Sequence, residues 1–170
     1  AEPKDPDPEI RRQARDTLHV LADPEPAPGA AQCLEDASEL VRAAAARALG
    51  ELGGPTAVDA LLARLQKDAE SSVVIRSASE GITQISLRYR AEQAAIRAKA
   101  GKPLRDALDE SQKGTDTITR QSLIRALGPA GDEAALSKLY AILKGPAESR
   151  TDYRDRTVFQ DRIAAAKALS

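Results

Sequence analysis

The chain of 170 residues has no tryptophan or methionine, one phenylalanine, three tyrosines, one histidine and one cysteine. A single cysteine excludes an internal disulfide framework, so cysteine usage does not indicate a redox compartment. The scarcity of aromatic residues argues against an all-β domain, whose strands favour aromatic and β-branched side chains. One histidine and one cysteine also cannot supply the ligand set of a structural zinc site. These absences leave helical folds as the main class to consider.

Long apolar runs and a strong overall charge are missing as well. No run approaches the roughly 20 apolar residues of a membrane span, because Arg42 and Arg47 interrupt even the alanine-rich segment. The formal net charge of −1 gives no overall reason to expect nucleic acid or an anionic membrane as the main partner. The charge is uneven, since residues 1–40 carry ten acidic and four basic residues and residues 86–105 carry six basic and one acidic. We therefore expect an electrically dipolar molecule.

What the chain does have is alanine and leucine, within an apolar content of 42 %. Small and straight-chain residues favour helices and allow helices to pack closely. A chain of this length and apolar content can bury a continuous core. We predict an all-α protein.

The sequence also repeats itself. The stretch from Ile10 to Leu34 returns 31 residues later as the stretch from Val41 to Leu65. In the second copy, apolar residues at helical spacing lead to a Gly-Gly-Pro turn at residues 53–55, and a second apolar helix follows. Asp36 or Ser38 is expected to cap the first helix. A period in this range is typical of stacked helix pairs, in which each unit buries its apolar face against the next.

Further copies lie at offsets of 33, 78 and 120 residues from the second one. We predict an extended segment at 1–8 and one α-solenoid over 9–170, with about four repeats and the first helix of a fifth. The expected repeats are 9–35, 36–67, 70–113, 115–145 and an incomplete 150–170. In the third, the apolar stripe continues past Tyr89, which predicts one long helix from Ser77 to Lys99, ended by Gly101 and Pro103, and a shorter helix after it.

The pattern from Asp36 to Leu65 resembles a HEAT repeat, specifically the short bacterial type also found in phycobilin lyases. In that family an acidic residue at a turn and an arginine six positions later form a polar ladder between neighbouring repeats. The same spacing occurs in three pairs here, which are Asp5 and Arg11, Asp36 and Arg42, and Glu70 and Arg76. The fourth repeat departs from it, because Asp116 and Arg120 are only four residues apart. The resemblance implies an α-solenoid that acts as a scaffold for proteins.

Residues suited to catalysis are few. His19, the only histidine, is expected near a helix C-terminus, where an imidazole can interact with the helix dipole. Cys33 aligns with Arg64 of the next repeat and is expected to be partly exposed and without a special role. No nucleotide-binding or hydrolase motif is present, and acidic residues fall at turns and helix caps. We expect no enzyme activity, no metal and no cofactor. The Met-less start at Ala1 slightly favours an exported protein, although a cytoplasmic one fits equally.

The most informative candidates for binding are the polar positions of the second helices, which line one surface of such a stack. In the second repeat these are Asp59, Arg64 and Lys67, and in the fourth they are Lys138 and Lys144. Most of them are basic. We therefore expect a protein partner with an acidic surface.

The basic stretch at residues 86–105 supports an alternative. It includes Arg88, Arg90 and Arg97 with Tyr89 among them, and such a combination can hold nucleic acid. The charge is local to one repeat, however, so we favour a protein contact. A further alternative from the resemblance is a subunit of a lyase, which would bind a tetrapyrrole or a similar ligand. A contact through the incomplete C-terminal repeat is also open.

Overall fold

The computed structural model describes residues 26–67, 69–111, 116–144 and 153–169. The helices are α2 Pro26–Cys33, α3 Glu39–Leu52, α4 Ala57–Leu65, α5 Ser72–Arg88, the short 3-10 helix η1 Arg90–Glu92, α6 Gln93–Ser111, α7 Thr117–Ala130, α8 Glu133–Lys144 and α9 Tyr153–Leu169. No strand occurs within these ranges, and none of their helices is both long and apolar enough to cross a membrane. The prediction of an all-α solenoid is confirmed.

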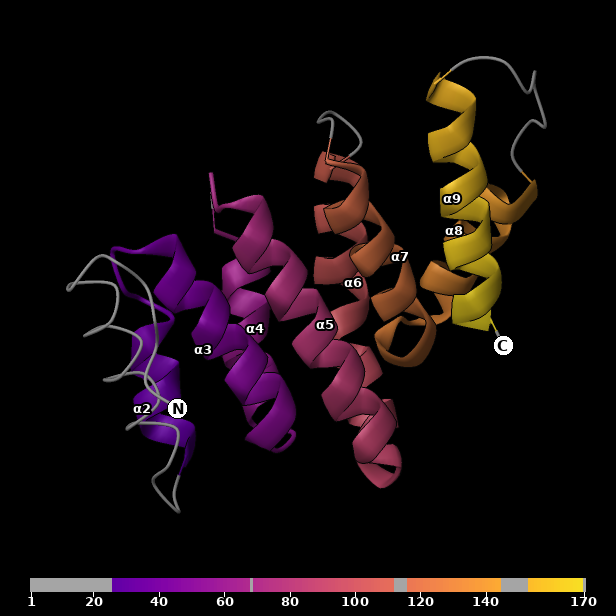
Figure 1. Ribbon diagram of the computed structural model, residues 1–170. Helices are drawn as coiled ribbons and strands as arrows, with labels where there is room; N and C mark the ends of the chain where they lie inside the picture. Colours follow the sequence, from indigo (N-terminus) through magenta and orange to yellow (C-terminus); the bar gives the residue numbers. More distant parts are fainter. Residues whose placement is uncertain (1–25, 68, 112–115, 145–152, 170) are drawn as a thin grey trace.

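The helices form two parallel layers (Figure 1). The first helices of the repeats, α3, α5, α7 and α9, pack side by side in one layer, each against the next. The second helices, α2, α4, α6 and α8, lie behind them, and each packs mainly on the first helix that follows it in the chain. One apolar core runs between the layers from Ala30 to Ala165. The stack therefore has two broad surfaces, one made by each layer.

The offsets found in the sequence agree with the helix boundaries. Helices α3 and α7 begin and end exactly 78 residues apart, and α5 begins 33 residues after α3. Gly50 and Gly128 are equivalent at the offset of 78. An added Cβ on Gly50 would lie 2.5 Å from the Cα of Gly81 in α5, and one on Gly128 would lie 2.2 Å from the carbonyl oxygen of Ala168 in α9. These two glycines therefore let successive first helices approach closely, and Gly50 lies inside α3 rather than ending it.

The turn after each of these helices uses glycine for a different reason from the left-handed cap that the sequence suggested. Gly53 has a φ of −74° and Gly131 a φ of −79°, which any residue can adopt. An added Cβ would lie 2.3 Å from the carbonyl oxygen of Leu49 at Gly53, and 2.2 Å from that of Leu127 at Gly131. Crowding by the preceding helix turn therefore explains both glycines.

The prediction of one helix from Ser77 to Lys99 is wrong. Helix α5 ends at Arg88, Tyr89 leaves the helical conformation at ψ 66°, and η1 leads into α6. Tyr89 still packs against the core, which explains why the apolar stripe seemed continuous. Helix α6 in turn runs through Gly101 and Pro103 instead of ending there. Gly101 lies against Asp132, where an added Cβ would come within 2.5 Å of the Asp132 carboxyl carbon, so close packing on the next repeat explains this glycine.

Candidate binding surface

The predicted polar ladder exists at one boundary between repeats, where two arginines share Glu70. Arg42 donates from Nε and Nη2 to Oε1 of Glu70, at 3.2 and 2.7 Å, and Arg64 donates from Nη1 to Oε2 at 3.1 Å. The Glu70 side chain is only 2 % exposed. Burial alone would raise the pKa of Glu70, but the hydrogen bonds from Arg42 and from the Ser71 backbone, with the two guanidinium charges, hold that pKa below its ordinary value.

Arg42 also closes the turn that precedes α3. Its Nη1 donates to the carbonyl oxygens of Asp36 and Ala37, at 2.8 and 2.9 Å. Ser38 occupies the N-cap position, while the Asp36 carboxylate accepts from the Ser38 backbone N–H at 2.7 Å. The two candidates for the cap thus act together, and Arg42 ties this turn to the next repeat through Glu70.

The ladder changes form in the following repeats. Helix α5 matches α3 at an offset of 33, which turns Arg76 by one residue, about 100°, away from the position of Arg42. Asp116 is a helix cap whose carboxylate accepts from the backbone N–H groups of Ile118 and Thr119, and a hydrogen bond from the Thr119 hydroxyl contributes most to lowering its pKa. Arg120 instead forms a 2.8 Å ion pair with Asp161 of α9.

Arg64 does not lie on the open surface where the sequence placed it. The residue is 3 % exposed, and besides Glu70 it binds Oε1 of Glu35 through Nη2 at 2.5 Å. Two carboxylates compensate for the burial of its charge, so it joins three successive repeats instead of pointing to a partner. Cys33, its equivalent in the first repeat, is partly exposed, and burial with the nearby Asp36 raises the pKa of its thiol.

We call the exposed side chains of α2, α4, α6 and α8 the second-helix surface. Lysine–carboxylate pairs cross from each helix or its end to the next. Lys67 binds Glu35 at 3.2 Å, Lys99 binds Asp59 at 2.8 Å, and Lys138 binds Asp109. The Lys67 and Lys99 side chains are 51 % and 54 % exposed, respectively, whereas Lys138 is 22 % exposed. Lys144 is exposed at the end of α8. The structure therefore places four predicted residues, Asp59, Lys67, Lys138 and Lys144, in one layer.

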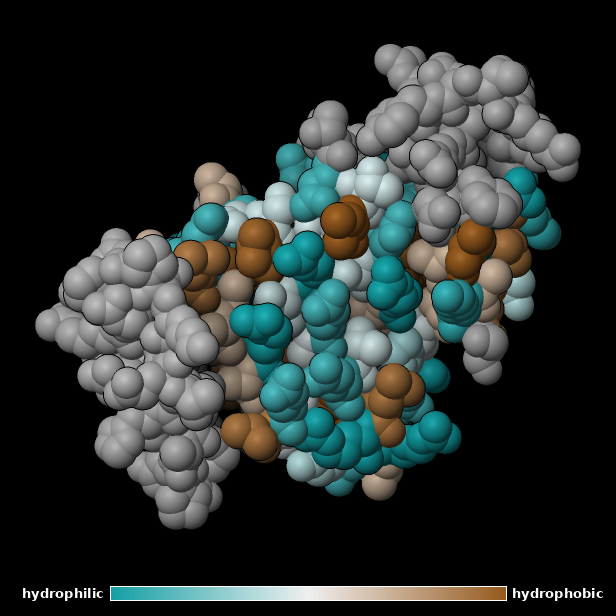
Figure 2. Space-filling model, viewed as in Figure 1, coloured by the Kyte–Doolittle hydropathy of each residue, from teal (hydrophilic) through white to brown (hydrophobic). Residues whose placement is uncertain are grey.

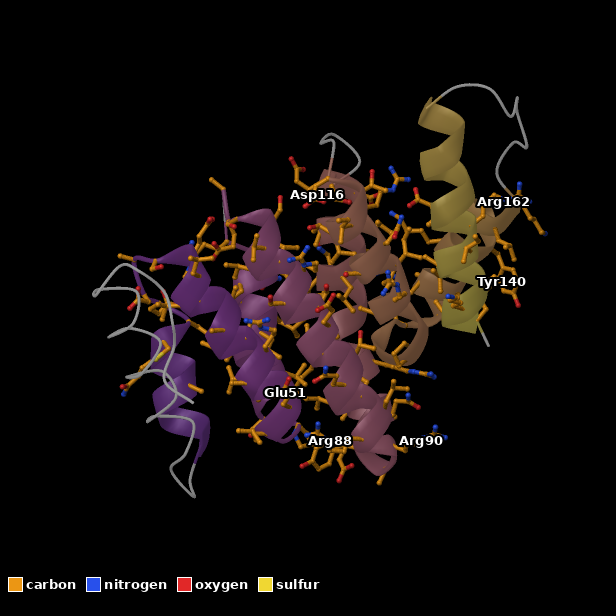
Figure 3. All side chains as sticks on the ribbon, in the orientation of Figure 1. Glu51, Arg88, Arg90, Asp116, Tyr140 and Arg162 are labelled. Atoms are coloured by element: carbon orange, nitrogen blue, oxygen red, sulfur yellow. The ribbon has the colours of Figure 1, made fainter. Side chains whose placement is uncertain are left out.

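The three arginines of the 86–105 stretch lie apart from this row. Arg88 donates to the carbonyl oxygen of Gly50, at 3.1 Å, and so covers the end of α3. Arg97 donates to the carbonyl oxygen of Pro129 at 3.1 Å. Arg90 is exposed, and Figure 3 shows it with Arg88 at the edge of the stack formed by the turns. Because Arg88 and Arg97 hold helix ends and Tyr89 packs inward, this stretch does not form a stacked basic face for nucleic acid.

Sequence reasoning missed the carboxylates that pair with these cations, although a signal for them exists. Most of the pairs join residues about one repeat apart, such as Glu35 and Arg64 at a separation of 29, and Asp109 and Lys138, also at 29. Arg105 and Asp132 are 27 apart and lie within 2.6 Å. Opposite charges separated by about one repeat period therefore identify contacts between neighbouring helices of one layer.

Candidate metal sites and the comparisons with known proteins complete the description. Within the described ranges, no group of three or more histidine, cysteine, aspartate or glutamate side chains is placed to hold a metal ion. His19 and the predicted acidic residues of the N-terminal segment lie outside those ranges. Residues 3–82 match the family model of HEAT repeats. A search of curated proteins gives no significant match.

Proposed function

We propose that this chain, which carries HEAT repeats, is a non-enzymatic scaffold that binds a partner protein on its second-helix surface. HEAT repeats commonly serve as scaffolds for protein interactions. The observation that carries the proposal is the row of ion pairs on this surface, because it fixes lysines and carboxylates across three helix boundaries. An elongated partner could contact several repeats at once on such a surface.

The exposed lysines favour a partner that presents acidic residues. Exposed ion pairs contribute about 0–1 kcal/mol each, so Lys67 and Lys99 can exchange Glu35 and Asp59 for carboxylates of a partner at little cost. Complementary charges would mainly speed association and select the correct partner. Arg64 has no part in this contact, because its guanidinium is buried and binds Glu35 and Glu70.

Cross-linking mass spectrometry tests this proposal. The tagged chain is incubated in nuclease-treated extract from its native source, and lysine cross-links to recovered proteins are mapped. We expect a stoichiometric protein linked through Lys67, Lys99 or Lys144. Reversing the charge of both Lys67 and Lys99 to glutamate should reduce its recovery about tenfold or more, because two contacts with an acidic surface become repulsive.

The matched control reverses two exposed charges on the other layer. Arg47 in α3 and Arg125 in α7 are equivalent at the offset of 78 and are both exposed. Arg47→Glu with Arg125→Glu should leave recovery unchanged. If the control variant loses the partner while Lys67→Glu with Lys99→Glu retains it, the binding surface is formed by the first helices. If nuclease treatment abolishes capture, the chain binds nucleic acid and the proposal fails.

A further inference from the structure

Helix α8 carries an uncovered apolar row. Leu136, Tyr140 and Leu143 are spaced four and three residues apart and so lie on one face of the helix. Leu136 is 41 % exposed and Tyr140 is 50 % exposed, whereas Leu143 is partly buried. Figure 3 shows Tyr140 beside α9 at the C-terminal end of the stack. Apolar residues exposed in one contiguous row are a feature of interaction sites.

The equivalent row of α4 is buried. At the offset of 78 residues, Leu136 corresponds to Val58, which is 0 % exposed, and Tyr140 corresponds to Leu62, which is 7 % exposed. The difference is confined to one side of the helix. Leu139 of α8 and its equivalent Leu61 in α4 are both 0 % exposed. A comparison of the neighbours of the two helices should therefore identify what covers α4.

The missing neighbour is a following second helix. Helix α4 packs against α2, α3, α5 and α6, and α8 packs against α6, α7 and α9, which correspond to the first three of these. Within the described ranges, nothing on α8 corresponds to α6 on α4. The face formed by Leu136, Tyr140 and Leu143, which we call the α8 face, is therefore the equivalent of the face that α6 covers on α4.

Helix α6 shows the chemistry of an occupant that fits this kind of face. Its buried residues Ile96, Ala100 and Leu104 recur every fourth position, at 3 %, 0 % and 0 % exposure. The small Ala100 in the middle of the row allows close approach of the two helices. Lys99, next to the row, forms an exposed ion pair with Asp59 of α4. An amphipathic helix with apolar residues at every fourth position meets these requirements.

We infer that the α8 face is a docking site for an amphipathic helix of a partner protein, held as α6 is held on α4. The site lies at the end of the stack and is separate from the row of ion pairs on which the proposed function rests. Two α8 faces of two copies would bury only roughly 400 Å² in total if each contributes one half-exposed tyrosine and leucine, well below the roughly 1,000 Å² of a stable interface. A helix that also contacts α9, as α6 also contacts α5, buries more.

A direct test uses α6 itself as the probe. A fluorescein-labelled peptide of residues 93–111 is titrated with the full chain, and its anisotropy is recorded. We expect saturable binding that weakens about tenfold or more in the variant Leu136→Glu with Tyr140→Glu, because the row at the centre of the contact becomes charged. The same peptide with Ala100→Glu should not bind, since the larger charged side chain prevents close approach.

The matched control places the same charges on other exposed leucines. Leu40→Glu with Leu52→Glu changes two residues of α3 that are 58 % and 53 % exposed, and it should leave peptide binding unchanged. Absence of saturable binding, or equal binding by the α8 and α3 variants, would refute the docking site. Sedimentation of the chain alone is measured in parallel. A dimer that dissociates only in the α8 variant would assign the face to a second copy and overturn the partner helix.

Discussion

Replacing Glu70 tests the buried contact that joins the first three repeats. Glu70→Ala removes the acceptor of hydrogen bonds from Arg42, Arg64 and the Ser71 backbone. The Arg64 side chain is 4 % exposed and would keep only Glu35, which is 64 % exposed. Its Nε already has no hydrogen-bond partner. Removing one member of a buried ion pair costs about 3–5 kcal/mol, because the remaining charge is left without compensation.

We expect Glu70→Ala to lower the free energy of unfolding by about 3 kcal/mol, at the lower end of that range, since Arg64 keeps Glu35 and Arg42 keeps two carbonyl groups. Urea denaturation followed by far-UV circular dichroism at neutral pH measures this change. Glu51→Ala is the control, because Glu51 is exposed on α3 (Figure 3), and it should change stability by less than about 0.5 kcal/mol.

The effect of Glu70→Ala should depend on pH. The pKa of Glu70 is lower in the folded chain than its ordinary value, so the unfolded chain takes up the proton first on acidification. The stabilisation by Glu70 is therefore complete above the ordinary pKa and is lost as the pH falls through the folded pKa. The difference between wild type and variant should shrink in that acidic range. A variant as stable as the wild type at neutral pH, or a difference that grows on acidification, would refute the reasoning.

Two further substitutions test the packing. Leu61→Ala should lower the free energy of unfolding by about 2–5 kcal/mol in urea denaturation, because Leu61 is fully buried between the layers, and an unchanged midpoint would contradict the assigned core. Gly50→Ala should cost about 1–3 kcal/mol, because its Cβ would lie 2.5 Å from the Cα of Gly81 and force α3 and α5 apart. Gly54→Ala is its control, since the nearest atom, the Tyr89 hydroxyl oxygen, is 3.9 Å away; equal losses for the two glycines would show that close helix approach is not the cause.

The repeat pattern was predictable because it is periodic. Matching apolar residues such as Leu49 and Leu127 at a fixed offset determines which helices are equivalent, and the structure gives α3 and α7 the same length and the same glycines. The irregular third repeat was not predictable in the same way. Tyr89 continues the apolar stripe of α5 while its backbone leaves the helix, and Pro103 lies within α6 instead of ending it.

The binding surface was predictable only in part, because exposure depends on contacts between repeats. Arg64 occupies a polar position on a second helix, and nothing local to it indicates that Glu35 and Glu70 enclose it. Likewise, Leu136 and Val58 have the same place in the repeat pattern, but their exposure differs by 41 percentage points because only Val58 has a following helix beside it. Position within a repeat predicts the face of a helix, whereas the neighbouring repeat decides whether that face is open.

The proposed role as a scaffold is tested most directly by acetylation footprinting of the chain alone and in the complex recovered by cross-linking. Lys67 and Lys99 report on the second-helix surface, and Lys167 in α9 reports on the first helices. The account predicts that the partner protects Lys67 and Lys99 while the modification of Lys167 stays the same. Protection of Lys167 with unchanged modification of Lys67 and Lys99 would contradict it.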